Sequence, residues 1–198
     1  MHINKLQFRN AKPEDIPSIM EIEHASFSSV ICEKQEVFIE RINIFPEGFR
    51  VMLYEGKPIG YICTEIWKKQ RPYSDNMFKL GHSIAKQHSI SGDEIYISSM
   101  GILPAWRSQG IGKLMFNKYI KYAEKTFVDV NSIILIVSEK WLNARRIYKS
   151  EGFKEVHLIR NFFRYGFDKS DFEDGIVMRK KRIKRDIITI QKKEGESE

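Results

Sequence analysis

The chain has 198 residues, of which 42% are apolar and 30% are charged, and its formal net charge is +7. This composition is typical of one globular domain with a sizeable core, and it excludes a largely disordered chain. The apolar runs are too short to span a bilayer and no signal peptide is evident, so we expect a cytoplasmic protein without a membrane segment. Cys32 and Cys63 are far apart, so we expect reduced thiols and no metal site.

The N-terminal third of the chain predicts one strand, two helices and a hairpin. The alternating residues 6–12 form the strand, and Pro13 then opens a helix, since proline is tolerated at the first helical position. A second, short helix is expected at 33–42. Two β-rich runs, 49–54 and 59–67, are joined by the turn residues EGKP and so predict the hairpin.

The next segment, residues 68–92, is polar and has no clear periodicity. Loops of this length are uncommon in compact domains and are often functional, so we expect a lid or an insertion that carries a short helix. Its two histidines, His82 and His88, would reach a nearby site if the segment closes over it. The alternative is that they are ordinary surface histidines of a loop.

The C-terminal half alternates strands and helices. A strand is expected at 93–103, and the continuous run SIILIV at 132–137 is typical of a strand buried on both faces. A helix at 141–153 then precedes a last strand at 175–181. The helix between the first two strands should give them a parallel pairing. Its buried stripe is expected to consist of Ile111, Leu114, Met115, Tyr119, Tyr122 and Ala123.

Much of the positive charge lies near the end of the chain, where six of the seven residues at 179–185 are Lys or Arg. A basic end after a folded domain is usually a solvated tail or the flank of a last strand, and an anionic partner such as RNA or a membrane surface is the alternative. We favour the first interpretation, so nucleic acid is not an expected partner. The domain should then cover residues 1–182, followed by a basic and then polar tail at 183–198.

Two glycines, Gly110 and Gly112, stand where a strand gives way to a long helix. Amide groups at a helix start lack partners within the helix, and the helix dipole adds positive charge, so an anion such as phosphate can bind there. Arg107 and Lys113 add charge; a tight turn that needs glycine only for its geometry is the alternative. A Walker loop does not fit, because Arg107 and Leu114 replace two of its required residues, and a dinucleotide fingerprint lacks its third glycine.

The spacing R-x-x-G-x-G after a strand that ends in GILP resembles the GNAT N-acetyltransferase superfamily, whose [Q/R]-x-x-G-x-[G/A] hallmark joins the fourth strand to the third helix. A second hallmark is a strand and then a helix with a tyrosine before xxxGF, which is Tyr148 in ARRIYKSEGF. The resemblance covers about residues 6–180. It implies an α/β fold with a mixed central sheet of about six to seven strands flanked by about four helices.

In this family the fourth and fifth strands, here about 94–103 and 132–137, splay apart and hold acetyl-CoA, the expected cosubstrate, between them. The resemblance implies cofactor contacts at Met100, Gly101, Ile102, Arg107, Ser108, Gln109, Gly110, Ile111, Gly112 and Lys113. Most relatives also carry an asparagine seven residues before the tyrosine, where this chain has Trp141. Asn143, two residues later, and Tyr148 are the remaining candidate cofactor contacts.

The resemblance also implies direct attack of an amine on the thioester, with Tyr148 as the acid that assists the departing thiolate. A packed tyrosine without a catalytic role is the alternative. Alkylamines are mostly protonated at neutral pH, with a pKa of about 10, so a base or a water path is needed. The candidate bases are Glu94, Tyr96 and, through a water, Ser98, with Glu139 near the end of the next strand.

The two halves of the chain resemble different groups of this superfamily. EIEHASFSSV and EGKPIGYI resemble arylalkylamine N-acetyltransferases, whose paired histidines would align with Tyr96 and Ser98. IRNFF and FEDGIVM resemble ribosomal-protein and N-terminal peptide acetyltransferases, whose glutamate base would align with Ile136. Neither base is therefore present at its position. Phe27 is either a wall of the acceptor pocket or a core residue.

We therefore expect an acetyl-CoA-dependent N-acetyltransferase that acts on a primary amine, either a small molecule or a peptide N-terminus. The alternative is a non-catalytic module of the same fold that holds an acyl-CoA or a partner. Tyr148 favours the enzyme. A homodimer and a monomer both remain open.

Overall fold

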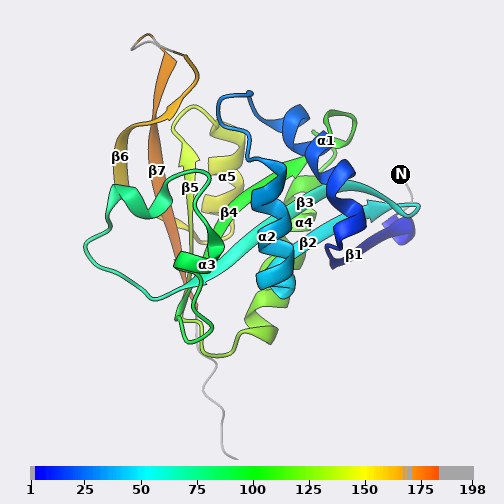
Figure 1. The fold of residues 1–198 in the computed structure, drawn as a ribbon, viewed down its shortest axis with the longest axis horizontal. Helices are drawn as coiled ribbons and strands as arrows, with labels where there is room; N and C mark the ends of the chain where they lie inside the picture. Colours follow the sequence, from blue (N-terminus) through cyan, green and yellow to red (C-terminus); the bar gives the residue numbers. More distant parts are fainter. Residues whose placement is uncertain (1–2, 167, 169–170, 183–198) are drawn as a thin grey trace, which may run out of the picture.

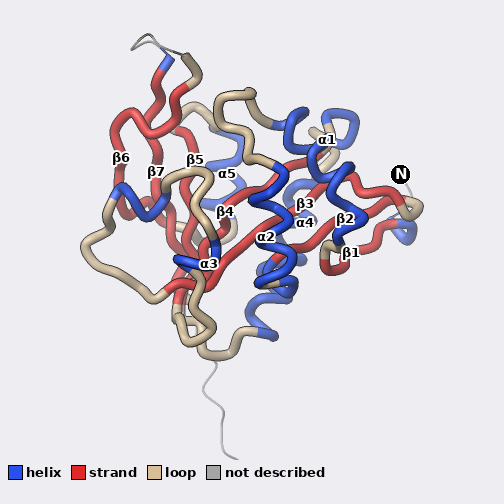
Figure 2. Tube along the Cα trace, viewed as in Figure 1, coloured by secondary structure: helices blue, strands red, loops and turns tan. Residues whose placement is uncertain are grey.

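The computed structural model describes residues 3–166, 168 and 171–182. The predicted tail at 183–198 lies outside the described residues. The described part forms one seven-stranded sheet in the order β1-β2-β3-β4-β5-β7-β6, with helices on both faces (Figures 1 and 2). This mixed architecture confirms the expected fold class.

The strands are β1 Leu6–Asn10, β2 Phe49–Tyr54, β3 Lys57–Trp67, β4 Glu94–Ile102, β5 Ser132–Ser138, β6 Lys154–Arg164 and β7 Phe172–Lys181. The α-helices are α1 Ile16–Ser26, α2 Gln35–Ile44, α3 Ile84–Gln87, α4 Ile111–Thr126 and α5 Leu142–Ser150. Short 3-10 turns are η1 Ile3–Lys5, η2 Pro13–Asp15, η3 Pro46–Gly48, η4 Asp75–Phe78 and η5 Pro104–Trp106.

Among the paired strands, β4 and β5 are parallel and every other neighbouring pair is antiparallel. α4 is the crossover between these two parallel strands, as the strand–helix–strand pattern predicted. In Figure 1, α1 and α2 lie in front of the sheet and α4 lies behind it. In the strand order the parallel pair lies near the middle of the sheet. A helix layer covers each face.

Successive residues of β3 belong to different cores, because side chains alternate between the two faces of a strand. Tyr61 and Cys63 pack with the apolar side of α1 and α2, while Ile62 packs with α4. All three side chains are completely buried. β3 is thus the central wall between the two cores.

The buried stripe of α4 is turned around the helix relative to the stripe that the sequence pattern predicted. Ile111, Met115, Tyr119 and Ala123 are buried as expected, but Leu114 and Tyr122 are half-exposed. Two residues outside the predicted stripe, Phe116 and Ile120, are buried instead. The helix therefore packs on a face turned toward Phe116, where that ring contacts Tyr148 and Phe153.

Residues 68–92 form an ordered insertion between β3 and β4 that carries η4 and α3. Phe78 and Ile84 within it are completely buried, and the Phe78 ring packs against Trp67 and Tyr96. The prediction of an insertion with a short helix is confirmed. Apolar anchors explain why such a polar segment has a fixed position.

A strand was missing from the sequence prediction, which has one strand after the last helix. The structure has two, because β6 pairs antiparallel with β7 at the edge of the sheet. The alternation of β6 is hidden by a register shift between Ile159 and Phe163, where Asn161 has a φ of 53°. A bulge of this kind breaks the period of two that identifies a strand.

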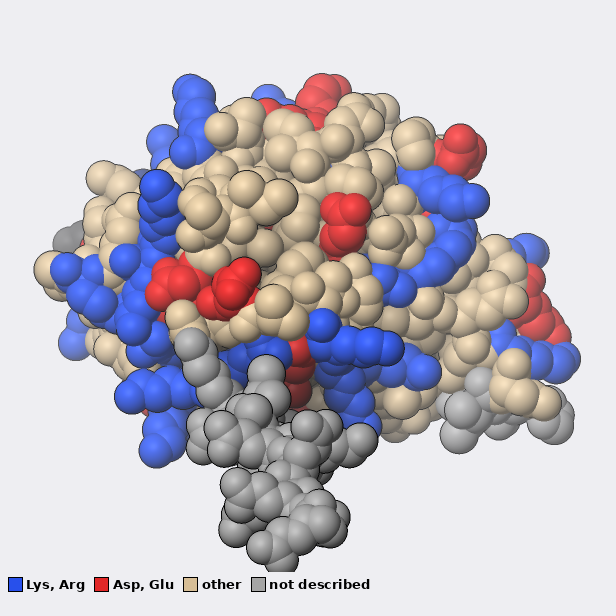
Figure 3. Space-filling model, turned by 90° about the horizontal axis from the view of Figure 1, so that it is seen from below, with Lys and Arg blue, Asp and Glu red and all other residues tan. Residues whose placement is uncertain are grey.

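Basic and acidic side chains share the surface. On the face shown in Figure 3, Lys and Arg lie in separate patches with Asp and Glu between them, rather than in one continuous stripe. Within the described part of the chain, no helix is both long and apolar enough to cross a bilayer.

Candidate active site

The two parallel strands separate after four paired residues. β4 and β5 pair from Glu94 with Ser132 to Ile97 with Leu135. Beyond that point β5 continues along β7, while β4 continues along β3. The edges of β4 and β5 that face each other are therefore unpaired from Ser98 onward, which opens the sheet at its centre.

A β-bulge lies where this opening begins. Thr64 of β3 pairs with Ile97, but the preceding residue, Cys63, pairs with Ser99, so Ser98 is an extra residue in β4. The Ser98 hydroxyl donates to the main-chain oxygen of Cys63 at 3.1 Å. Because a bulge bends and twists its strand, it gives a physical reason for β4 to leave β5 here.

A pocket lies in this opening, which we call the inner pocket. It brings together the central strands, α1, the segment after α1, α5 and one residue of the insertion. The residues that line it are Glu23, Phe27, Ile31, Glu33, Leu80, Ile97, Ser98, Ser99, Met100, Leu135, Ile136, Val137, Trp141, Tyr148 and Phe163. Tyr148 was predicted to lie at the site, and it lines this pocket. Phe27, for which a pocket wall and a core residue were the alternatives, lines it as well.

Tyr148 reaches the inner pocket from α5. Its side chain is 9% exposed and packs against Phe116, with 5.0 Å between ring centroids. Burial raises the pKa of the Tyr148 phenol to about 12. The phenol therefore keeps its proton at neutral pH and can act as a hydrogen-bond donor.

Glu23 is one of two acidic residues of the inner pocket, with Glu33, that the sequence prediction missed. It lies on α1, its side chain is 1% exposed, and it lines the inner pocket. One carboxyl oxygen accepts the main-chain N–H of Glu33 at 2.8 Å, and the other accepts the hydroxyl of Tyr61. Burial raises the pKa of Glu23 to about 7, although both hydrogen bonds favour the ionised form.

The sequence carried a signal for Glu23. Ile16 and Ile19 mark the apolar face of α1, and Glu23 follows Ile19 by four residues, so it occupies the same face. A carboxyl group within an apolar stripe is costly to bury unless it is hydrogen-bonded, and it is therefore a candidate functional residue.

A chain of hydrogen bonds joins Glu23 to a second residue of the inner pocket. The hydroxyl of Tyr61, which donates to Glu23, lies 2.7 Å from the hydroxyl of Ser99. Ser99 itself lines the inner pocket. Burial is the main cause that raises the pKa of Tyr61, so this phenol stays protonated and can relay a proton between its neighbours.

The structure does not bring Glu94 to the inner pocket. Glu94 lies at the start of β4, where its carboxylate accepts hydrogen bonds from Ser132 at 2.8 Å, Arg179 at 2.8 Å and Arg71 at 3.1 Å. Four residues of strand, roughly 13 Å, separate it from Ser98. Its contacts are those of a buried ion pair that joins β4, β5 and β7.

Tyr96 also lies outside the inner pocket. Its ring stacks on Trp67 with 4.0 Å between centroids and packs against Phe78 of the insertion. Burial raises the pKa of the Tyr96 phenol, so it is a poor base at neutral pH. Ser98, the third candidate, lines the pocket, whereas Glu139 accepts the main-chain N–H of Asp174 at the end of β5.

The histidines of the insertion have structural partners. His82 lies 2.8 Å from the Glu65 carboxylate through Nε2 and 2.9 Å from the Lys79 carbonyl through Nδ1. Both partners are acceptors, so the ring makes both hydrogen bonds when both of its nitrogens carry a proton. His88 accepts the main-chain N–H of Ile66 at 3.1 Å. Neither histidine lines the inner pocket.

The glycine-rich turn has open space where the sequence predicted an anion. Gly110 precedes α4 with a φ of 76°, and a Cβ built there would meet no atom within 4 Å. A Cβ on Gly112 would meet only Ile102, at 3.8 Å. The first helical hydrogen bond of α4 joins Leu114 N–H to Gly110 O, so the amides of Ile111, Gly112 and Lys113 precede the helical ladder.

The side chains around this turn are arranged differently from expectation. Arg107 donates through Nε to the Ile102 carbonyl at 2.9 Å and through Nη2 to the Ala25 carbonyl at 2.8 Å. It therefore ties the end of α1 to the end of β4, and its guanidinium is not a free positive group. Gln109 donates to the Ala105 carbonyl, and Ser108 is exposed with a φ of 59°.

Of four further predicted cofactor contacts, one side chain lines the inner pocket and three residues do not. Met100 lines the inner pocket, whereas Gly101 is packed under α1, where a Cβ would lie 2.9 Å from both Ile22 and Ser26. Asn143 is exposed and faces a separate hollow at the start of α5. Lys113 lies 3.5 Å from the Glu151 carboxylate.

A sheet that opens between its two parallel strands, beside a helix start with free amides, is the arrangement expected of an acyl-CoA N-acyltransferase fold. The family model described as Acetyltransferase (GNAT) family matches residues 16–153. The chain belongs to the GNAT family. This confirms the resemblance drawn from the two sequence motifs.

Similar proteins agree with this assignment. The N-alpha-acetyltransferase of Sulfurisphaera tokodaii is 25% identical over 162 residues, which cover 82% of this chain and 88% of that protein. N-alpha-acetyltransferase 60 of Xenopus tropicalis is 26% identical over 111 residues, which cover 56% of this chain and 44% of that protein. The chain is an N-acetyltransferase.

Solved structures share the fold. The loading GNATL domain of CurA from Lyngbya majuscula has a TM-score of 0.75 at 16% identity, covering 89% of this chain and 97% of that one. The ribosomal-protein-S18-alanine N-acetyltransferase of Escherichia coli has a TM-score of 0.66 at 19% identity, covering 89% and 93%. At these identities the likeness shows the fold alone.

Proposed function

We propose that this chain transfers the acetyl group of acetyl-CoA to a primary amine and that this amine is the N-terminus of a peptide. The observation that carries the proposal is the inner pocket, which holds a carboxyl group of raised pKa, Glu23, and a protonated phenol, Tyr148. The relatives named N-alpha-acetyltransferase support a peptide amine over a small-molecule amine.

Acetyl-CoA would enter through the opening between β4 and β5. Its pantetheine arm would run along the unpaired edge of β4 near Met100, as an added strand does in other sheets. Its pyrophosphate would bind the amides that precede the helical ladder of α4, where Gly110 and Gly112 leave room. Arg107 would act by positioning this turn, because its guanidinium is bound to main-chain oxygens.

Glu23 is the proposed base. The amine must lose a proton before its nitrogen can attack the thioester carbon, and a base works best when its pKa is close to the working pH. A pKa of about 7 meets this condition. The amine proton would reach Glu23 through Ser99 and Tyr61, whose hydroxyls form the hydrogen-bond chain described above.

Tyr148 is the proposed donor to the leaving group. When the carbon–sulfur bond breaks, negative charge develops on the CoA sulfur, and a nearby donor lowers the energy of that state. A thiol has a pKa of about 8.5. Because the pKa of Tyr148 is about 12, the phenol keeps its proton and stabilises the thiolate through a hydrogen bond. The thiolate then takes its proton from water after release.

The test is the release of free thiol from acetyl-CoA with a set of short peptides and small-molecule amines. We expect turnover with peptides, and we expect Tyr148→Phe to lower kcat by about 10² to 10⁴-fold, the usual contribution of an acid or base. Its acetyl-CoA affinity should be unchanged. If no amine releases thiol although acetyl-CoA binds tightly, the chain is a non-catalytic module and the proposal is wrong.

A further inference from the structure

The insertion at 68–92 contributes one side chain, Leu80, to the inner pocket. A second hollow on the surface, which we call the outer groove, is bounded by the segment after α1, by η4 and the residues after it, and by β6. Leu80 and Ile31 line both hollows. These two apolar side chains therefore lie between the inner pocket and the outer groove, at a place that we call the neck.

Leu80 is held in place by its neighbours in the chain. The N–H of Gly81 donates to the Glu33 carboxylate at 3.2 Å, and His82 binds the buried Glu65 carboxylate at 2.8 Å. Phe78, two residues before Leu80, is completely buried. These contacts on both sides hold the main chain of Leu80 beside the neck.

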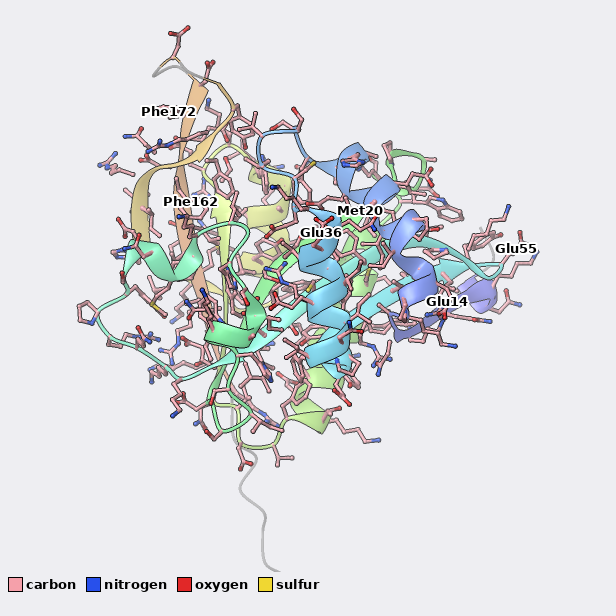
Figure 4. The ribbon with its side chains drawn as sticks, viewed as in Figure 1. Glu14, Met20, Glu36, Glu55, Phe162 and Phe172 are labelled. Atoms are coloured by element: carbon pink, nitrogen blue, oxygen red, sulfur yellow. The ribbon has the colours of Figure 1, made fainter. Side chains whose placement is uncertain are left out.

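The outer groove continues the neck to the surface. It is lined on the insertion by Asn76 and Lys79 and on β6 by Ile159 and Phe162. Figure 4 shows Phe162 on β6, above the part of the insertion that carries η4. His157 of β6 and Asp75 of η4 lie 3.4 Å apart, and Asp75 also lines the outer groove, so this contact joins the insertion to β6 at the groove.

The space beyond the neck is small. The cavity volume of the inner pocket is about 70 Å³. A cavity measured in this way needs only about 10 to 15 Å³ to hold one water, so the pocket has room for a few small groups, such as an amine with a small substituent beside the acetyl group. A bulky side chain beside the amine would have to share the neck with Leu80 and Ile31.

We propose that the insertion is a wall of the acceptor site and that Leu80 determines which acceptors are used, by limiting the size of the group next to the reacting amine. This inference rests on the proposed function. An extended peptide would place its amine in the inner pocket, its first side chain at the neck and its following residues in the outer groove. The enzyme would then prefer peptides whose first residue is small.

The experiment measures kcat/KM for two short peptides that differ only in their first residue, Ser or Phe. We expect the wild type to prefer Ser. Leu80→Ala should shift the Ser-to-Phe ratio toward Phe by at least about tenfold, since one or more methylenes in an apolar pocket change discrimination by about 10 to 200-fold. Leu80→Trp has the opposite effect on the neck, because the larger side chain narrows it. This substitution should raise KM for both peptides and leave acetyl-CoA affinity unchanged.

The matched control is Ile90→Ala, which removes an apolar side chain from the same insertion at a position that is 90% exposed. Its ratio should equal that of the wild type. A Ser-to-Phe ratio that stays within twofold in folded Leu80→Ala, with normal turnover of the wild type, would overturn the role of Leu80 and leave the proposed function intact. Absence of turnover by the wild type with every peptide would overturn both.

Discussion

The main-chain N–H of Glu33 donates a hydrogen bond of 2.8 Å to the carboxylate of Glu23. The second oxygen of the same carboxylate accepts the hydroxyl of Tyr61. Glu23 is therefore held from two directions inside an apolar helix face. Burial nevertheless raises its pKa to about 7, so the ionised form is costly at neutral pH. A charge kept at such a cost is a reason to look for a function.

Glu23→Gln should remove most of the activity and preserve the fold. We expect kcat to fall by about 10² to 10⁴-fold, because the amide cannot accept the amine proton. The free energy of unfolding at pH 8 should stay equal or rise, by up to roughly 3 kcal/mol, because a buried charge is removed. Tyr61 can accept from the new amide and donate to Ser99 instead.

The control for this substitution is Glu21→Gln, which changes an exposed carboxylate on the same helix. Its activity and stability should match those of the wild type. Urea unfolding and thiol release at saturating acetyl-CoA measure both quantities. Near-normal turnover in Glu23→Gln would show that the base is another group.

The rate should depend on pH through Glu23. Since the carboxyl group must be ionised to accept a proton, kcat/KM should rise as the pH increases through about 7, the pKa of Glu23. A peptide N-terminus also titrates, with a pKa of about 7.7 to 8.0. In Glu23→Gln, the rise of kcat/KM that follows ionisation of Glu23 should disappear. The rise that follows deprotonation of the peptide N-terminus should remain. A wild-type profile that follows only the amine would contradict the assignment.

Gly112→Ala should separate acetyl-CoA binding from folding. A Cβ at this position meets only Ile102, at 3.8 Å, and alanine is favoured over glycine in a helix by about 1 kcal/mol. The Tm should therefore not fall, while the acetyl-CoA Kd should rise at least about tenfold if the pyrophosphate lies against this turn. Gly110 is less suitable, because its φ of 76° would strain any side chain there.

Calorimetry with acetyl-CoA is the measurement, and Lys121→Ala on the exposed side of α4 is the control. The control should bind acetyl-CoA as the wild type does. Unchanged affinity in Gly112→Ala would move the pyrophosphate site away from the start of α4.

His82 should make the stability of the insertion depend on pH. Burial would lower the pKa of His82, but its hydrogen bond to Glu65 and the charge of Glu65 outweigh burial and raise that pKa. The interaction therefore stabilises the fold fully below the unfolded pKa of about 6.5 and is lost as the pH rises through the higher folded value. The difference in free energy of unfolding between wild type and His82→Gln should shrink across that range.

His88 provides a comparison of opposite sign. Burial lowers the pKa of His88, and its ring accepts the N–H of Ile66, so the neutral form is favoured in the folded state. Its contribution should be lost as the pH falls below the unfolded value. Urea unfolding of both variants at several pH values tests the pair, and parallel slopes for His82→Gln and His88→Gln would refute this account.

Local patterns were enough to predict most of the fold and part of the site. The parallel β4–α4–β5 unit, the hairpin β2–β3 and the turn at Gly110 follow from periodicity and from residues with a special backbone preference, and these are short-range properties. Tyr148 could be singled out because its position before the glycine that ends α5 is also a local motif. Each of these depends only on residues near in the chain.

The tertiary structure alone decided which acidic group reaches the pocket. Glu94 and Glu23 are both buried carboxylates, but the start of β4 pairs Glu94 with Arg179. The packing of α1 on the sheet instead brings Glu23 to Tyr61, whose hydroxyl contacts Ser99. The neck at Leu80 likewise joins segments far apart in the sequence. Burial and pKa depend on such long-range contacts, because each contact changes the solvation and charge around a group, and no local pattern records them.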